Sequence, residues 1–308
     1  MKTTVFLFLV AAVASSTVAQ ALPNRPQRPD ARRTPALPEG TKGLRDLAYV
    51  PNGHERQILD LFLPPGATNP LPLIIWIHGG AWRAGSKEQC PALRFVERGY
   101  AVASVNYRLS QHAIFPAQIE DCKAAVRWLR AHAKEYNLAP DRFAAWGSSA
   151  GGHLVALLGA SGDVKGFDVG ENLAVSSRVQ AVVDFFGPTD FTQMSKFSLT
   201  NALFDHDAAD SPESLLIGGA IQQNRDKAAK ASPLTYVSSD DPPFLILHGN
   251  QDNLVPYQQS ELLRDALQRA RVPVTFKIIP GAGHGFGGPD IDRQLTEFFE
   301  RQLRTLKK

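Results

Sequence analysis

Short apolar runs alternate with longer stretches of helical periodicity along most of this chain. From Leu73 onward the runs are rich in β-branched residues and nearly continuous, which is the pattern of parallel strands covered on both faces. Strands are therefore predicted over residues 57–63, 73–78, 101–106, 143–147, 179–186, 244–248 and 274–279.

Helical periodicity fills the intervals between these strands. Residues 116–136 place the apolar positions of one helix face at Ile119, Cys122, Val126 and Leu129. Further helices are predicted over residues 154–158, 257–270 and 291–306. This alternation predicts an α/β fold, with a mostly parallel, twisted sheet and helices on both of its faces.

Two segments depart from the strand–helix rhythm. Residues 47–50 and 57–63 flank the turn sequence Pro51-Asn52-Gly53, which predicts a hairpin at an antiparallel edge of the sheet. Residues 187–232 lose the apolar periodicity and are rich in small and polar side chains. An interval that long predicts an insertion or lid, here placed before the strand at 244–248.

The N-terminal part of the chain has the pattern of an export signal. Lys2 precedes an apolar run that is too short to span a bilayer, and small residues follow it, so residues 1–19 are predicted to be a signal peptide. Residues 20–42 are rich in proline and arginine and are predicted to be an extended linker. The α/β domain is then 43–308, and we expect a secreted or periplasmic protein without a stable membrane anchor.

Composition narrows the function classes. The 308 residues are 44% hydrophobic, and the net charge of +3 comes from residues 1–42, which hold six basic against two acidic side chains. The remaining domain is nearly neutral, which disfavours nucleic-acid binding. In an exported chain the cysteines Cys90 and Cys122 are candidates for a disulfide. They do not suffice for a structural zinc site, and no metal or cofactor is expected.

The string Gly147-Ser148-Ser149-Ala150-Gly151 has the form G-x-S-x-G. It follows a predicted strand directly and opens a predicted helix, which is the context that a nucleophilic serine needs. The tight turn lifts the Ser149 hydroxyl clear of the sheet, and the flanking glycines permit close approach of strand and helix. A plain serine-rich turn remains the alternative for this motif taken alone.

A second glycine motif ends the strand at 73–78 in the string HGGAW. Glycines let the backbone turn its N–H groups toward a developing oxyanion. The predicted donors are the N–H groups of Gly80, Ala81 and Ala150. His78 is an alternative base, but its place at the strand end favours a role in fixing the loop.

Activation of a serine requires a base held by a carboxylate. Asp252 follows the strand at 244–248, and His284 lies among glycines after the strand at 274–279, which gives the chain order serine, acid, histidine. We assign Asp252 as the acid and His284 as the base. Asp240 and Asp241 are rival acids, but they precede their strand and belong at its opposite end.

Residues 60–284 resemble the α/β-hydrolase superfamily, and within it the esterases related to hormone-sensitive lipase. The strings HGGAW, VNYRLS, FPAQIEDCKAAVRWL, GSSAGGHL, HGNQDNLVP and GAGHGF look most like bacterial feruloyl and acetyl-xylan esterases. The resemblance implies a cofactor-free carboxylic ester hydrolase acting on a small-molecule or oligosaccharide ester. This sequence has Ala81 where the lipase-like HGGG motif has its third glycine. The substitution is compatible with the role, because the oxyanion hole requires a backbone N–H and not a particular side chain.

The substrate is not fixed by these motifs. Trp82 and Phe286 are the candidate substrate-binding residues, although aromatic residues near strand ends are more often part of the core. The HGG-x-W pattern also occurs in a formamidase branch of the superfamily, which keeps amide-like substrates open. A catalytically inactive binding protein of the same fold is the remaining alternative.

Overall fold

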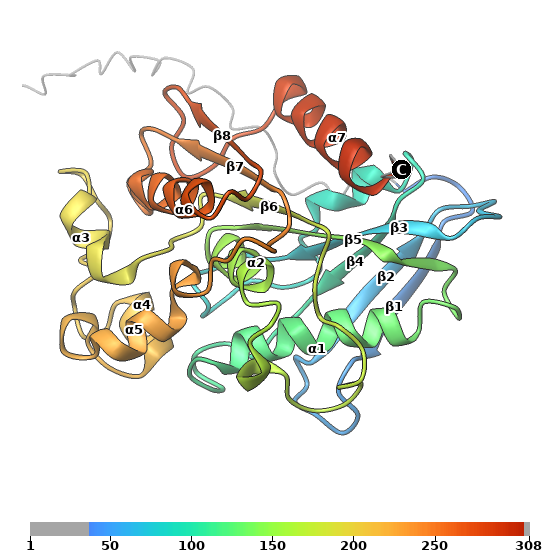
Figure 1. The fold of residues 1–308 in the computed structure, drawn as a ribbon, viewed down its shortest axis with the longest axis horizontal. Helices are drawn as coiled ribbons and strands as arrows, with labels where there is room; N and C mark the ends of the chain where they lie inside the picture. The colour runs from blue at the N-terminus through green and yellow to red at the C-terminus, as the bar shows by residue number, and fades with distance from the viewer. Residues whose placement is uncertain (1–36, 305–308) are drawn as a thin grey trace, which may run out of the picture. The chain divides into compact units, whose positions relative to one another are not determined.

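The computed structural model describes residues 37–304 as one sheet with helices on both faces (Figure 1). The predicted signal peptide and the linker up to residue 36 lie outside the described residues. The strands are β1 (Lys42–Ala48), β2 (Ile58–Leu63), β3 (Leu71–Ile77), β4 (Ala101–Val105), β5 (Leu138–Ser148), β6 (Ala181–Phe185), β7 (Phe244–Gly249) and β8 (Val274–Ile279). Their order is β1-β2-β4-β3-β5-β6-β7-β8.

All neighbours from β4 to β8 in this order are parallel, whereas β1, β2 and β4 pair antiparallel. The predicted mostly parallel sheet and its antiparallel edge are therefore confirmed. The edge strand β1 differs from the expected position, because its first residues are exposed and mixed in polarity and so give little hydrophobic signal.

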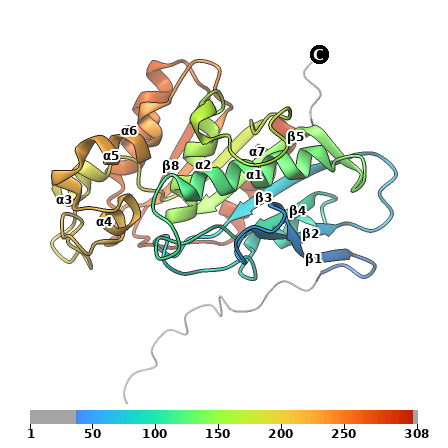
Figure 2. The same cartoon turned by 90° about the horizontal axis from the view of Figure 1, so that it is seen from below.

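The longer helices divide between the two faces of the sheet. They are α1 (Ala117–Ala131), α2 (Ala150–Ala160), α6 (Gln258–Arg269) and α7 (Pro289–Leu303). The helices α1, α2 and α6 pack on one face, and α7 packs on the other with the short 3₁₀ segment Pro91–Phe95. Figure 1 shows α1 below the sheet and α7 above it, and in Figure 2 α1 and α2 lie in front of the sheet.

Strand β3 shows why the central strands lack polar residues. Leu73, Ile75 and Ile77 pack against the α1–α2 side, and Ile74 and Trp76 pack against the α7 side. Side chains alternate between the faces of a strand, so a sheet covered twice needs an apolar residue at every position.

The same two-sided arrangement contradicts the predicted disulfide. Cys90 is buried in the cluster beneath α7, Cys122 is buried in the cluster beneath α1, and both thiols are free. The sheet lies between them, and a disulfide needs Cα atoms within about 7 Å. The two cysteines lie before and after the same strand, β4, which suggested that they are close in space. The segments that carry them cover opposite faces of the sheet instead.

The insertion (residues 187–232) lies between β6 and β7. Its helices are short: α3 (Met194–Phe197), α4 (Pro212–Ile217) and α5 (Arg225–Ala231). It is tied to other loops by backbone hydrogen bonds, 2.8 Å from Phe115 N–H to Leu216 O and 3.0 Å from Leu203 N–H to Asn253 O. The insertion therefore contacts the loop that carries Asp252.

None of the helices in residues 37–304 has both the length and the apolar character that a membrane crossing requires.

Candidate active site

Ser149 occupies a strained turn between β5 and α2. Its backbone has φ 56° and ψ −123°, and its N–H donates to Phe185 O at 2.8 Å. A Cβ added to Gly147 would lie 2.2 Å from Gly151 O, and one added to Gly151 would lie 2.1 Å from Ile77 O. Only glycine fits at either position, so the motif glycines are required by backbone contact. Positive φ in a non-glycine residue is typical of functional sites.

The glycine loop (residues 78–82) lies directly beside this turn. A Cβ on Gly79 would be 2.7 Å from Ser148 O and 3.3 Å from Ser149 Cβ. Gly80 and Ala81 have φ of 108° and 54°, which turns the backbone sharply. The hydrogen bonds of the loop use Gly80 O as acceptor, and the N–H groups of Gly80 and Ala81 have no partner among the described residues.

Ala150 is the first residue of α2, so its N–H belongs to the helix N-terminus. The first N–H groups of a helix have no partner within the helix, and the helix dipole is positive there. The first turn carries no acidic side chain that would compete for these donors. Ala150 follows Ser149 directly, and Gly80 and Ala81 follow Gly79, whose Cα lies beside the serine turn.

His78 fixes the glycine loop. Its ring is stacked on Tyr107 with ring centroids 4.5 Å apart, Nδ1 lies 2.7 Å from Gly79 O, and Nε2 lies 3.1 Å from Arg56 Nη2. Burial, with a smaller contribution from Arg56, lowers the pKa of His78 to about 4, although the Gly79 carbonyl acts to raise it. These contacts fit the predicted anchoring role and not that of a base.

Arg56 was not identified from the sequence. Its guanidinium also donates to Tyr107 O at 2.9 Å and to Gly85 O at 3.0 Å, so it joins the edge hairpin to the end of the glycine loop. No sequence signal marks this arginine, because it lies in the turn before β2 and its partners, backbone carbonyls and the His78 ring, are distant along the chain.

Asp252 and His284 are brought together as predicted. His284 Nδ1 donates to Asp252 Oδ2 at 2.7 Å, and Asp252 Oδ1 accepts from the N–H groups of Leu254 and Val255 at 2.9 Å each. Burial acts to raise the pKa of Asp252, but hydrogen bonds from His248 and His284 outweigh it and hold that pKa well below the usual range. The carboxylate is therefore ionised wherever the protein is folded near neutral pH.

The serine lies at the same edge of the sheet as this pair. Ser149, Asp252 and His284 each follow the carboxyl end of a strand, β5, β7 and β8, and these strands are parallel. Phe186 lies between them in the fold: its neighbour Phe185 accepts the Ser149 N–H, and its own ring centroid is 4.6 Å from that of His284. Among the described residues, no hydrogen bond joins the Ser149 hydroxyl to the imidazole, a bond that often tightens only with substrate present.

The two predicted substrate-binding residues, Trp82 and Phe286, differ in burial. Trp82 is only 2% exposed, and its indole N–H donates to His153 Nδ1 at 3.2 Å. Its assignment to the substrate pocket is therefore wrong, because the side chain packs beneath the site with His153 and Phe191. Phe286 is half-buried, and its ring lies 5.3 Å from that of Phe186, so it remains beside the imidazole.

The rival acids lie elsewhere. Asp240 and Asp241 precede the first residue of β7 and hydrogen-bond Ser238, and Asp240 also pairs with Arg178. They are at the amino end of the strand, opposite Asp252.

Asp184 is a buried carboxyl close to the serine turn. It is paired with Gly147 in the sheet register, its Oδ1 accepts from Gly187 N–H at 2.9 Å, and its Oδ2 has no hydrogen-bond partner. Burial raises the pKa of Asp184 to about 7, although the Gly187 N–H acts to lower it. Because this pKa lies above that of the unfolded chain, the native state holds a proton that the unfolded state releases. Stability is therefore lost as the pH rises from about 4 to about 7.

Replacement of Asp184 by Asn is expected to remove this pH-dependent loss. A rise from 3.8 to about 7 corresponds to about 4 kcal/mol, so the variant should gain on that order relative to wild type between pH 4 and pH 8. Urea unfolding at several pH values measures the difference. Asp141→Asn, at a highly exposed carboxyl, is the control and should follow the wild-type curve. If the free energy of unfolding changed with pH in the same way for wild type and Asp184→Asn, Asp184 would not be protonated in the native state.

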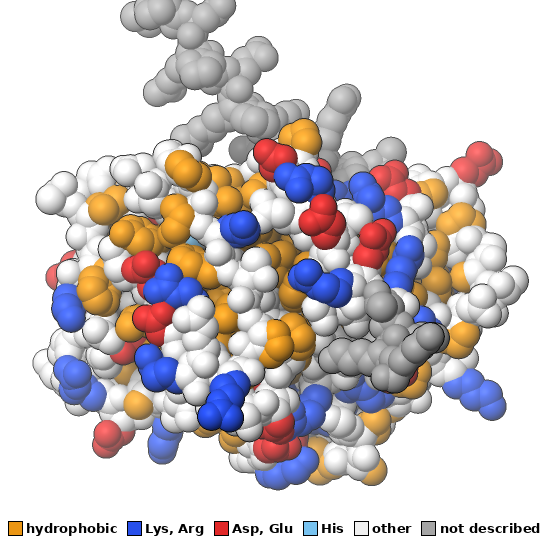
Figure 3. Space-filling view, turned by 45° about the horizontal axis from the view of Figure 1, so that its top comes forward, with side chains coloured by type: hydrophobic (Ala, Val, Ile, Leu, Met, Phe, Trp, Pro, Cys, Tyr) orange, Lys and Arg blue, Asp and Glu red, His pale blue; other side chains and the backbone are white. Residues whose placement is uncertain are grey.

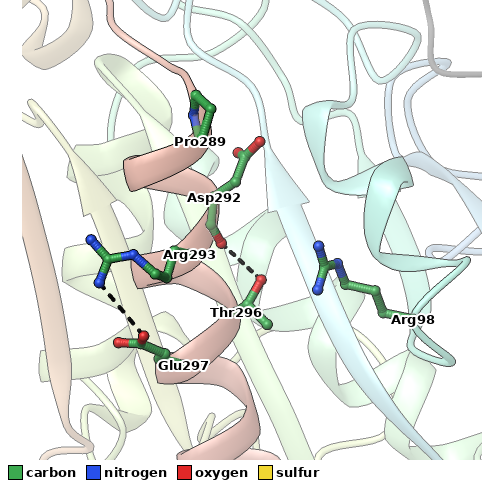
Figure 4. Close-up of a pocket in the computed structure, with 6 residues that line it drawn as sticks. All are labelled: Arg98, Pro289, Asp292, Arg293, Thr296 and Glu297. Carbon is green, nitrogen blue, oxygen red and sulfur yellow. Dashed lines mark hydrogen bonds and ion pairs between the residues drawn. The ribbon is translucent and has the colours of Figure 1, made fainter.

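A groove of about 430 Å³ lies along α7 and is lined by Arg98, Pro289, Asp292, Arg293, Thr296 and Glu297. Figure 4 shows Arg98 facing the helix across the groove, while Arg293 pairs with Glu297 and Thr296 donates to Asp292 O. It contains none of the predicted site residues. Within residues 37–304 there is also no group of His, Cys, Asp and Glu side chains suited to a metal ion.

Comparison with known proteins gives this chain a family. The BD-FAE family model matches residues 59–267. The chain is 34% identical over 251 residues to the esterase LipQ of Mycobacterium tuberculosis, a match covering 78% of this chain and 56% of that protein. The chain thus spans just over half the length of that relative.

Solved structures agree with this assignment. A truncated carbohydrate esterase from gut microbiota matches with a TM-score of 0.78 and 35% identity, over 85% of this chain and 96% of that one. A bifunctional GH43-CE protein of Bacteroides eggerthii matches with a TM-score of 0.77 and 35% identity, over 84% of this chain and 38% of that one. The α/β-hydrolase fold implied by the sequence motifs is therefore confirmed.

Proposed function

Because the chain belongs to the BD-FAE family of α/β-hydrolases, we propose that it is a carboxylic ester hydrolase with Ser149, His284 and Asp252 as its catalytic triad. The observation that carries this proposal is the Asp252–His284 hydrogen bond, formed at the sheet edge where the strained Ser149 turn and the glycine loop also lie. Nucleophile, base and orienting carboxylate are the parts that acyl transfer to serine requires.

The reaction proceeds by two acyl transfers. His284 Nε2 takes the hydroxyl proton as Ser149 Oγ forms a bond to the ester carbonyl carbon. The tetrahedral intermediate collapses, the proton passes from His284 to the departing alkoxide, and an alcohol leaves. Water then attacks the acyl-enzyme with its proton going to His284. The second intermediate collapses, the proton passes from His284 to Ser149 Oγ, and the carboxylic acid leaves. Asp252 remains ionised and keeps the Nδ1 proton of His284 directed toward itself, which leaves Nε2 free to accept.

Backbone amides stabilise the oxyanion in both steps. The N–H groups of Gly80, Ala81 and Ala150 have the freedom from other partners and the nearness to Ser149 that this role needs. Fixed donors cost no reorganisation during the reaction, and loss of one costs roughly 100- to 1,000-fold in rate. His78, Tyr107 and Arg56 hold the loop in place.

Short acyl esters, including acetyl or feruloyl esters of plant polysaccharides, are the proposed substrates. The ring of Phe186 lies 4.6 Å from that of His284 and 5.3 Å from that of Phe286, and these rings offer an apolar wall for a small acyl or aryl group. Figure 3 shows hydrophobic side chains densest toward the side where α3 and α6 lie, with both signs of charge intermixed elsewhere. The name of one structural neighbour, a carbohydrate esterase, supports the polysaccharide class. Export, proposed from residues 1–19, would bring the enzyme to such material.

A panel of substrates tests this function. Purified protein is assayed with p-nitrophenyl acetate, butyrate and octanoate, with methyl ferulate, with acetylated xylan and with formanilide. We expect kcat/KM to fall from acetyl to octanoyl esters and to be higher for the esters than for formanilide. Preference for formanilide would establish the formamidase alternative. If no substrate is turned over and an organophosphate does not label Ser149, the esterase proposal is wrong and the alternative of a catalytically inactive binding protein remains.

A further inference from the structure

His248 is a second histidine in contact with the proposed catalytic acid, beside His284. It is the penultimate residue of β7 and fully buried, and its Nε2 lies 3.2 Å from Asp252 Oδ2 and 2.9 Å from Val255 O. Asp252 Oδ2 therefore has imidazole nitrogens of two different histidines within hydrogen-bonding distance. The sequence alone assigns His248 no role in the chemistry.

The surroundings of His248 fix which of its nitrogens carries the proton. Nε2 faces a carbonyl oxygen and a carboxylate oxygen, which only accept hydrogen bonds, so Nε2 must be the donor. Nδ1 lies 2.7 Å from Ser260 Oγ, and a hydroxyl can donate to it. Ser260 is fully buried in α6, so this hydroxyl is held by the helix that covers the strand.

The contacts of the acid show what His248 adds. Asp252 Oδ1 is held by the N–H groups of Leu254 and Val255, which fixes one oxygen to its own loop. Asp252 Oδ2 must face His284. Within the described residues, His248 is the other residue with an imidazole nitrogen within hydrogen-bonding distance of this oxygen. The same ring N–H holds Val255 O, so His248 ties the loop and the carboxylate to β7 at once.

We propose that His248, oriented by Ser260, is a positioning residue that holds Asp252 in the plane required by His284. This role presupposes the ester hydrolase activity proposed above. Small displacements of a catalytic group matter at such sites, and a shift of 1 Å can cost about 100-fold in rate. His248 touches neither the substrate nor the reacting atoms.

The proposal makes a specific prediction for the pH–rate profile. A donor on Asp252 Oδ2 withdraws negative charge that would otherwise stabilise a protonated His284. Without that donor the imidazolium is favoured, so the acid limb of kcat/KM moves to higher pH. The titratable groups facing His248 or its loop among the described residues are Asp252 itself, His284 beyond it, and His206 of the insertion, which bonds the Leu254 backbone. None of them is altered by the variants below.

The test compares variants of the full chain with p-nitrophenyl acetate. His248→Phe keeps an aromatic ring and removes the donor, and should lower kcat by about 10- to 100-fold with KM within about twofold and the acid limb raised. His248→Gln places an amide N–H near the position of Nε2 and should restore most of kcat and the wild-type acid limb. Ser260→Ala should give a smaller change of the same kind.

Leu267→Ala, a cavity in the same helix α6, controls for loss of stability alone. It should lower the melting temperature and leave the acid limb in place. The positioning role is overturned if His248→Phe has the wild-type kcat and acid limb. It is also overturned if His248→Phe resembles Leu267→Ala, with a lowered melting temperature and an unmoved acid limb. It is likewise overturned if Gln rescues nothing while folded. Ser149→Ala is assayed alongside. Activity surviving in that variant removes the proposed esterase mechanism, and with it the positioning role that rests on it. An inactive Ser149→Ala together with a wild-type kcat and acid limb for His248→Phe removes the positioning role alone.

Discussion

Ser149→Ala should abolish nearly all ester hydrolysis and leave the fold intact. Loss of a nucleophilic serine lowers kcat by roughly 10⁵- to 10⁶-fold, because the base has nothing left to activate. The backbone strain at position 149 is the same for Ala as for Ser, and the Ser149 N–H still reaches Phe185 O. Steady-state turnover of p-nitrophenyl acetate and a thermal unfolding curve, measured on the same preparation, check both halves of this expectation.

Ser148→Ala is the matched control. Ser148 is the adjacent residue at the end of β5, its backbone oxygen contacts the glycine loop, and its side chain has no part in the proposed reaction. Its kcat should stay within about twofold of wild type, because its half-buried side chain takes no part in the proposed reaction. If Ser149→Ala kept a tenth of the wild-type kcat, or if Ser148→Ala lost as much as Ser149→Ala, the assignment of the nucleophile would be wrong.

The parts of this site that sequence predicts are those set by local structure. The strain at Ser149 arises from a strand–turn–helix sequence, and the glycines at 147 and 151 are demanded by backbone contacts. Asp252 and His284 could be placed because parallel strands bring their carboxyl ends to one edge, whatever the packing of the helices. Chain order and strand polarity therefore sufficed to place these residues at one edge of the sheet.

The parts that sequence missed depend on which face of the sheet a segment covers. Cys90 and Cys122 flank the same strand but lie on opposite faces. Trp82 is the last residue of the glycine loop, yet its indole N–H donates to His153 in the interior. His248 lies in an apolar run and looks structural, until the fold places Asp252 and Ser260 on either side of its ring. Each of these outcomes follows from packing between elements distant along the chain, which no local pattern records.

Asp252→Asn is expected to lower kcat by about 10⁴-fold at neutral pH, through the tautomer of His284. Asp252 Oδ1 accepts from the Leu254 and Val255 N–H groups, so the amide oxygen of an Asn must take that place. Its NH₂ group then occupies the place of Oδ2 and faces His284 Nδ1 as a donor. Nδ1 must accept, the ring proton moves to Nε2, and the nitrogen directed at Ser149 can no longer take a proton.

Asp240→Asn separates this effect from the loss of any acidic residue near β7. Asp240 is the rival that precedes the strand, and its partners are Arg178 and Ser238 at an exposed end of the sheet. Loss of an exposed ion pair has little effect on stability, because water and salt screen it, and should leave kcat unaltered. The Asp252 variant should also regain activity as the pH is raised, if hydroxide replaces the base in deprotonating the serine. Equal activities for the two variants would show that the carboxylate at 252 does not orient the base.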